Sequence, residues 1–120
     1  MDKKFFVPYQ TARQLKEKGY NEECTFYYGD GIIRTERQLY TNKELSDNTP
    51  NWLFNECISA PTYHEVVDWF EEKGYLIETM WARYESNVVW FCRVAQKDTN
   101  IYPTREQALN EGIITALEML

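Results

Sequence analysis

The feature that most constrains the fold is a helix-ending phrase that occurs twice, at Leu15–Tyr20 and at Phe70–Tyr75. Each copy runs from an apolar residue through charged residues to Lys-Gly-Tyr. A glycine in the left-handed conformation just beyond a helix lets the next residue contact the last helical turn, as in a Schellman cap. The phrase therefore predicts helix ends at Gly19 and Gly74, where the tyrosine contacts the apolar residue that opens the phrase.

Both copies precede segments rich in β-branched and aromatic residues, so they divide the chain into two helix-then-strand units. Two explanations of the match stay open. A duplicated α-β-β unit accounts for it, and so do two independent helix ends, because the shared residues are those that a good cap selects.

The length of 120 residues and the hydrophobic content of 43% are sufficient for a single domain over residues 1–120. Periodicity and turn residues predict an α+β fold with two layers, in which three helices pack on a mainly antiparallel sheet of four or five strands. The element order is α-β-β-α-β-β-(β)-α. The first half is expected to contain a helix over 8–18, a hairpin and a long irregular loop over about 41–61. The hairpin joins strands at 24–28 and 32–35, and Glu36-Arg37-Gln38 leaves open whether its second strand extends as far as Tyr40. The second half is expected to contain a helix over 62–73, a hairpin over 76–84 and 88–94, an edge strand at 101–102 and a helix over 104–120.

Capping boxes define the starts of the two later helices, at Thr62-x-x-Glu65 and Thr104-x-x-Gln107. The helix after Thr62 has one apolar face, on which Val67 is expected to be buried, so Val67→Asp should unfold the domain. The apolar positions of that face are Tyr63, Val66, Val67 and Phe70.

Gly112 stands inside the last expected helix. An interior glycine is about 1 kcal/mol less favourable than alanine. A continuous helix therefore requires that Gly112 approach another backbone closely, and we expect that backbone to be the sheet; the alternative is a break in the helix at this residue.

The loop over 41–61 is unusually long for a compact domain. Its apolar residues Trp52 and Phe54 either fill an edge of the chain's own core or form an exposed tip that binds a partner.

Charge argues against binding to nucleic acid, because the formal net charge is −6 and a phosphate-binding surface needs clustered basic residues. Residues 61–120 carry 5 basic and 10 acidic side chains. In the first half, the basic cluster of Arg34, Arg37 and Lys43 is interrupted by Glu36 and Glu44.

Three widely separated cysteines, Cys24, Cys57 and Cys92, do not form a disulfide framework. The amino terminus lacks the apolar run of a signal peptide, and no stretch has the roughly 20 apolar residues of a membrane span. These features predict a reduced, cytoplasmic protein without a membrane segment.

Catalytic chemistry has weak support in the sequence. His64, the single histidine, has Asp68 one helical turn away, so the carboxylate could orient the imidazole. The spacing of Cys57 before His64 does not define a nucleophile pair, and the cysteines lack the close pairs of a structural zinc site. We therefore predict no catalytic residues, no cofactor and no metal, with His64 and Asp68 as weak polar candidates.

Several stretches together resemble a family of small uncharacterised proteins from gut bacteria and their phages and prophages. The resemblance spans nearly the whole chain, is most specific at residues 59–73, and implies a mobile-element context without any activity or site residue. The residues that carry it are Val7-Pro8-Tyr9, Cys24, Ser59-Ala60-Pro61-Thr62-Tyr63, Val66, Val67, Asp68, Trp69, Phe70, Lys73, Thr104–Leu109, Gly112, Ile113, Ala116 and Leu117.

The leading hypothesis for function is a cytoplasmic, non-enzymatic protein-interaction or accessory protein of phage or prophage context, with an unknown protein partner. An acidic, aromatic-rich domain without a polar constellation offers surfaces rather than reagents. The candidate surface residues are Trp52, Phe54, Trp69 and Trp81. The alternatives are a small-ligand or nucleic-acid binding module that uses the sheet and the 41–60 loop and, third, an enzyme with a site centred on His64.

Overall fold

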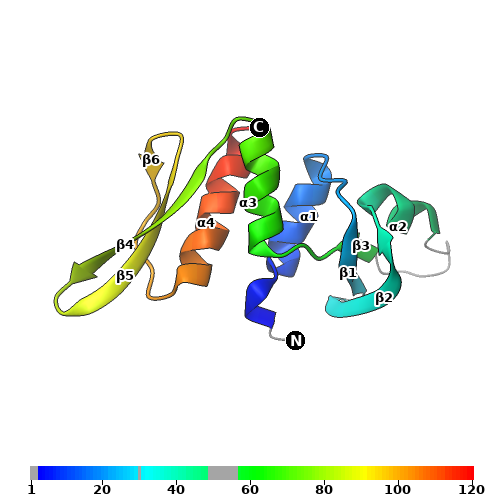
Figure 1. Cartoon of the computed structure of the whole chain (residues 1–120), viewed down its shortest axis with the longest axis horizontal. Helices are drawn as coiled ribbons and strands as arrows, with labels where there is room; N and C mark the ends of the chain where they lie inside the picture. The colour runs from blue at the N-terminus through cyan, green and yellow to red at the C-terminus, as the bar shows by residue number, and fades with distance from the viewer. Residues whose placement is uncertain (1–2, 30, 49–56) are drawn as a thin grey trace. The chain divides into compact units, whose positions relative to one another are not determined.

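The computed structural model of the chain describes residues 3–29, 31–48 and 57–120. The backbone forms two compact units, an N-unit of Phe6–Pro61 and a C-unit that joins Thr62–Leu120 to the residues up to Phe5 (Figure 1). Each unit combines helices with its own three-stranded antiparallel sheet. The α+β class and the antiparallel pairing predicted from the sequence are confirmed, and the strands lie in two sheets rather than one.

The N-unit contains two helices and a sheet in the order β2-β1-β3. Its core includes Leu15 and Tyr20 from the end of the first helix and Ile58 from the short third strand. The elements are α1 (Tyr9–Glu17), β1 (Cys24–Gly29), β2 (Ile32–Tyr40), α2 (Asn42–Asn48) and β3 (Cys57–Ser59).

The C-unit contains a sheet in the order β4-β5-β6 with its helices on one face (Figure 1). The helix α4 packs on β5 and β4, and α3 packs against α4. The elements are the 3-10 helix η1 (Lys3–Phe5), α3 (Tyr63–Glu72), β4 (Ile77–Tyr84), β5 (Asn87–Val94), β6 (Lys97–Asp98) and α4 (Arg105–Glu118).

The two units share a helix followed by a hairpin, but their sheets differ. The first strand of the hairpin is central in the N-unit, whereas the second strand is central in the C-unit. The two units are therefore similar only as far as the hairpin. The third strand pairs with the first strand of the hairpin in the N-unit and with the second strand in the C-unit.

Both copies of the phrase form the predicted Schellman caps. In α1, the amide of Tyr20 donates to the carbonyl of Leu15 at 2.9 Å, and Gly19 has a φ of +94°. In α3, the amide of Tyr75 donates to the carbonyl of Phe70 at 2.9 Å, and Gly74 has a φ of +89°. The rings of Phe70 and Tyr75 also meet edge to face, with centroids 6.5 Å apart. Local sequence alone therefore placed both helix ends correctly.

The segment predicted as an irregular loop over 41–61 contains α2 and β3. An unpredicted capping box starts α2. The amide of Glu44 donates to Thr41 Oγ1 at 3.2 Å, and the amide of Thr41 donates to Glu44 Oε1 at 3.1 Å. Residues 49–56, including Trp52 and Phe54, lie outside the described residues.

A buried asparagine ties α2 to the rest of the N-unit. Asn42 Nδ2 donates to the carbonyl of Tyr20 at 2.7 Å, and Asn42 Oδ1 accepts from the amide of Ser59 at 2.8 Å. One side chain thus joins the first turn of α2, the segment after α1 and the strand β3. These contacts explain why a polar heptapeptide without an apolar stripe forms a helix here.

The helix α4 is continuous through Gly112, as the first alternative required. A Cβ on this residue would lie 2.8 Å from Cys92 Cβ, so the absence of a side chain lets the helix lie directly on β5. The apolar face of α3 is rotated from the one expected, because its buried residues are Val66, Trp69 and Phe70. Val67 is only half-buried, so the expectation that Val67→Asp unfolds the domain loses its basis.

The predicted edge strand at 101–102 is reduced to a single bridge between Trp90 and Tyr102. The third strand of the C-unit is β6, which lies between the predicted hairpin and the predicted edge strand. Two non-glycine residues, Ala95 and Gln96, adopt positive φ values of 48° and 68° and form the tight turn before it.

Candidate functional site

The distal half of the β4–β5 hairpin, residues 80–91, is an apolar surface that we call the hairpin arm. Its strands pair in regular register, with Trp81 opposite Trp90, Arg83 opposite Val88, and Tyr84 opposite Asn87. A two-residue turn closes the arm, in which Glu85 and Ser86 have φ values of 50° and 70°. The paired strands and tight turn give the arm a defined backbone on which these side chains are held.

The arm is exposed because α4 covers the proximal half of the sheet. Ile77, Cys92 and Val94 are buried under the helix, whereas the arm extends beyond it (Figure 1). Strand alternation puts Trp81 on the same face as these core residues, yet 60% of its surface is exposed. The apolar pattern of that face therefore continues past the end of the core.

The opposite face of the arm is apolar as well. Tyr84 lies on this face and is 59% exposed. Val88 lies on the same face as Trp81, beyond the end of the helix, and is 46% exposed. Both faces thus present large apolar side chains to solvent. The remaining apolar residues of the outer face are Met80, Ala82, Val89 and Phe91, of which Ala82 is exposed and the others are half-buried.

The four aromatic residues predicted for an interaction surface are not brought together. Trp81 lies on the arm, but Trp69 is buried with 6% of its surface exposed, and Lys73 Nζ lies 4.6 Å from the centroid of its ring. Trp52 and Phe54 lie outside the described residues. Tyr84 and Val88 were not among the predicted surface residues, although strand alternation with apolar residues on both faces was a signal for them.

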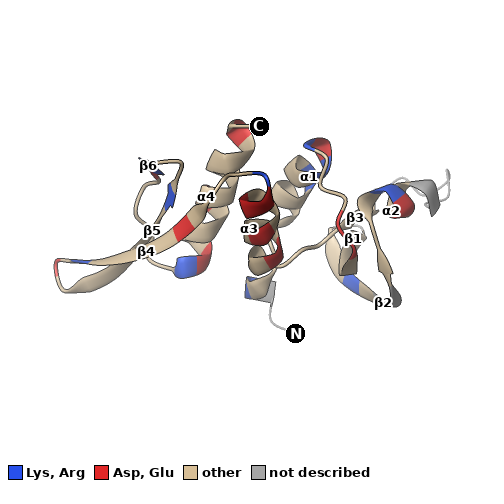
Figure 2. Cartoon of the chain, turned by 45° about the horizontal axis from the view of Figure 1, so that its top comes forward, with Lys and Arg blue, Asp and Glu red and all other residues tan. Residues whose placement is uncertain are grey.

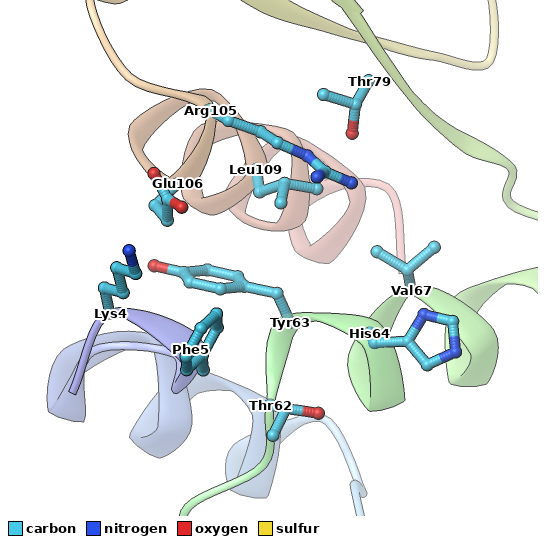
Figure 3. Close-up of a pocket in the computed structure, with 10 residues that line it drawn as sticks. All are labelled: Lys4, Phe5, Thr62, Tyr63, His64, Val67, Thr79, Arg105, Glu106 and Leu109. Atoms are coloured by element: carbon cyan, nitrogen blue, oxygen red, sulfur yellow. The ribbon is translucent and has the colours of Figure 1, made fainter. Parts of the chain in front are cut away.

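A pocket of about 420 Å³ lies in the C-unit, between η1, the first turns of α3 and α4, and β4 (Figure 3). Its apolar wall is formed by Phe5, Tyr63, Val67 and Leu109. The caps at Thr62 and Thr104 set where the two helices begin and so bring their first turns to the rim.

Charged side chains line the same pocket. Arg105, from the first turn of α4, reaches across it toward Thr79 and Val67, whereas Lys4 and Glu106 lie at the other end, near the Tyr63 hydroxyl (Figure 3). Acidic residues occupy much of α3 (Figure 2). The pocket therefore combines an apolar wall with an arginine in an otherwise acidic unit.

The weak polar candidates His64 and Asp68 lie together as their spacing predicted, with Nε2 of His64 3.4 Å from Oδ2 of Asp68. The side chain of His64 is 87% exposed, so the pair is a solvated surface contact. Burial raises the pKa of the Cys92 thiol, while a hydrogen bond from Thr79 and the charge of Arg105 act in the opposite direction. Burial has the largest effect on this pKa and favours the neutral thiol, which is a poor nucleophile.

Within the described ranges, no group of three or more histidine, cysteine, aspartate or glutamate side chains is arranged to hold a metal ion. None of the helices in the described part of the chain combines the length and apolar character needed to cross a membrane. Compared with family models, curated proteins and solved structures, the chain finds no match in any of the three.

Proposed function

We propose that the protein is a non-enzymatic interaction protein that binds a partner protein through the hairpin arm. The observation that supports this most directly is the exposure of Trp81 on a strand pair that also exposes Tyr84 and Val88. Contiguous exposed apolar surfaces on otherwise polar proteins commonly mark binding sites. Tryptophan, tyrosine and arginine dominate the binding energy of protein interfaces, and the arm presents Trp81, Tyr84 and Arg83.

The arm also has a suitable energetic balance for binding. Fully burying a large apolar side chain contributes about 1.5–3 kcal/mol relative to its exposure. Trp81, Tyr84 and Val88 supply three such side chains on a backbone that strand pairing already orders. Because the arm is pre-ordered, little additional conformational entropy is lost when a partner covers it.

The cellular setting is part of the proposal. Cys24, Cys57 and Cys92 are free thiols, which suits a reducing compartment and favours a cytoplasmic partner. The resemblance to small proteins of gut bacteria and their phages suggests a mobile-element context, and hence a partner from the bacterial host or the phage.

The experiment compares two bait proteins that differ only in which exposed apolar side chains are removed. The arm variant carries Trp81→Thr and Tyr84→Thr, since threonine keeps a high strand propensity. The matched control carries Leu76→Thr and Ile101→Thr, which remove two side chains of similar exposure from the same unit outside the arm. Circular dichroism and urea unfolding verify that both baits fold.

Each bait is incubated with bacterial lysate, and the retained proteins are quantified by mass spectrometry. A partner retained by the parent and the control but lost from the arm variant supports the proposal. Equal retention by both variants contradicts it. So does the absence of any enriched protein when the parent also does not self-associate. Retention on nucleic acid at low salt that disappears as salt is raised would instead favour the nucleic-acid alternative.

Sedimentation equilibrium of the purified parent tests whether the partner is a second copy of this chain. Self-association that the arm variant loses and the control retains would support the proposal and identify that partner.

A further inference from the structure

The pocket of the C-unit is lined by the guanidinium of Arg105. Arg105 makes no hydrogen bond or ion pair with any other residue in the described part of the chain. Its side chain nevertheless extends over the pocket rather than away from it (Figure 3). From this arrangement we propose that the pocket binds a small organic carboxylate, with the acid group on Arg105 and an apolar body against Tyr63, Val67 and Leu109.

The position of Arg105 is unfavourable for local structure. It occupies the first turn of α4, where the helix dipole presents its positive end and disfavours a cation. A local conflict of this kind, without a compensating partner, is typical of a functional position. A bound anion next to the guanidinium would remove the conflict, because it would neutralise the charge where the dipole also favours a negative group.

The chemistry of the guanidinium selects a carboxylate. Arginine presents parallel N–H donors in a fixed plane that matches the two oxygens of a carboxylate. Arg93, another arginine of the C-unit, is already paired in this way, with Nε 2.7 Å from Asp98 Oδ1 and Nη2 3.3 Å from Asp98 Oδ2. Arg105 has the same donors and lacks a carboxylate among the described residues.

The charge of the surroundings favours an anion with a single charge. The chain has a formal net charge of −6, and the acidic residues of α3 (Figure 2) are exposed. Such a field opposes a multiply charged phosphate more strongly than a monocarboxylate. At the other end of the pocket, Glu106 also disfavours a second acid group near Lys4.

The remaining lining suits an apolar body. Tyr63, Val67 and Leu109 form a wall beside Arg105, and Phe5 continues it toward η1 (Figure 3). The hydroxyl of Thr62 is already engaged, since it donates to Glu65 Oε1 at 2.9 Å and accepts from the Glu65 amide. The volume of about 420 Å³ falls within the roughly 300–1,000 Å³ of typical small-ligand sites. An aryl or short alkyl group therefore fits the space beside the guanidinium.

Three carboxylate probes test the proposal: 3-phenylpropionate, hexanoate and indole-3-acetate. The uncharged comparison is 3-phenylpropanamide, which has the same shape as the first probe without its charge. Binding is measured by amide chemical shifts in two-dimensional NMR of the whole chain, which also reports whether each variant is folded. Arg105→Gln removes the charge, and Lys97→Gln is the matched control, because Lys97 is an exposed cation of the same unit outside both the pocket and the hairpin arm.

We expect at least one carboxylate to bind saturably and to shift the amides of Tyr63, Val67 and Leu109. Arg105→Gln should weaken the affinity for each carboxylate that binds by about 10–100-fold, because charge-assisted hydrogen bonds are lost. The affinity for 3-phenylpropionate should then equal that for 3-phenylpropanamide. The uncharged amide should bind the parent and Arg105→Gln equally, and Lys97→Gln should bind the acid like the parent.

Val67→Trp provides a second variant, because the larger side chain should fill the pocket and abolish binding of acid and amide alike. The proposal is overturned if none of the three acids binds saturably, if Arg105→Gln leaves their affinities unchanged, or if the shifted amides lie outside the pocket. None of these results bears on the hairpin arm, so the two proposals fail independently.

Discussion

Gly112→Ala tests the helix-to-sheet contact that organises the C-unit. A Cβ at this position would lie 2.8 Å from Cys92 Cβ, 2.9 Å from Cys92 Sγ and 3.2 Å from Ile77 Cγ2. The Cβ of Cys92 is attached directly to the backbone of β5, so a change of rotamer cannot move it. Restoring ordinary carbon–carbon contact therefore requires α4 and β5 to separate by roughly 0.7 Å or more.

Two opposing terms set the size of the effect. Alanine is about 1 kcal/mol more favourable than glycine inside a helix. Overpacking a close-packed interior costs about 1–3 kcal/mol, and a clash with a backbone-attached atom belongs in the upper part of that range. The free energy of unfolding of the C-unit should therefore fall by about 1–2 kcal/mol, although the substitution improves helix propensity.

Urea unfolding followed by circular dichroism and tryptophan fluorescence measures this change. Gly74→Ala is the matched control, because the added Cβ would meet no atom within 4 Å. Any decrease in its free energy of unfolding therefore arises from the backbone φ of +89° alone. Adding Cys92→Ala removes the contact with the sulfur. It should therefore recover part of the free energy of unfolding lost in Gly112→Ala and none of that lost in Gly74→Ala. A Gly112→Ala protein as stable as the parent would refute close packing of α4 on β5.

Three further outcomes follow from the structure. Asn42→Leu should lower the free energy of unfolding by about 2–4 kcal/mol, because two buried backbone groups lose their partner; a urea midpoint equal to that of the parent would contradict this. The hydrogen bond from Arg93 lowers the pKa of Asp98, so this carboxylate contributes stability above its unfolded pKa that is lost as pH falls through the folded value; Arg93→Gln should raise the Asp98 midpoint in an NMR titration, and an unmoved midpoint would count against the pairing. Val66→Asp should destabilise the C-unit far more than Val67→Asp in thermal unfolding, since Val66 is fully buried and Val67 lines the pocket; the reverse order would show that the face of α3 is assigned incorrectly.

Elements that depend on neighbouring residues could be predicted from the sequence. The helix ends at Gly19 and Gly74 follow from a cap that involves six consecutive residues, and the hairpins follow from β-branched runs around turn residues. The helix α2 had a comparable local signal in Thr41-x-x-Glu44, which lacked the apolar stripe that usually confirms it. Its stability comes instead from the tertiary hydrogen bonds of Asn42, which spacing cannot reveal.

The candidate sites were less accessible to sequence reasoning. Of the aromatic residues predicted for an interaction surface, Trp81 is exposed and Trp69 is buried, although both are tryptophans. Whether an aromatic side chain is core or surface depends on how far the covering helix extends over the sheet. The pocket had no sequence signature either, because its walls come from segments near residues 4, 63, 79 and 105 that are distant in the chain.

The sequence by itself determined the class of fold, the helix ends and the two hairpins, because caps, turns and strand propensity act over a few neighbouring residues. It also indicated the close approach at Gly112, since a glycine tolerated inside a helix needs a packing reason. Only the tertiary structure decided the division into two sheets, the exposure of the hairpin arm and the open guanidinium of Arg105. Those features depend on which surfaces of distant segments cover one another, and that is a property of packing rather than of local sequence.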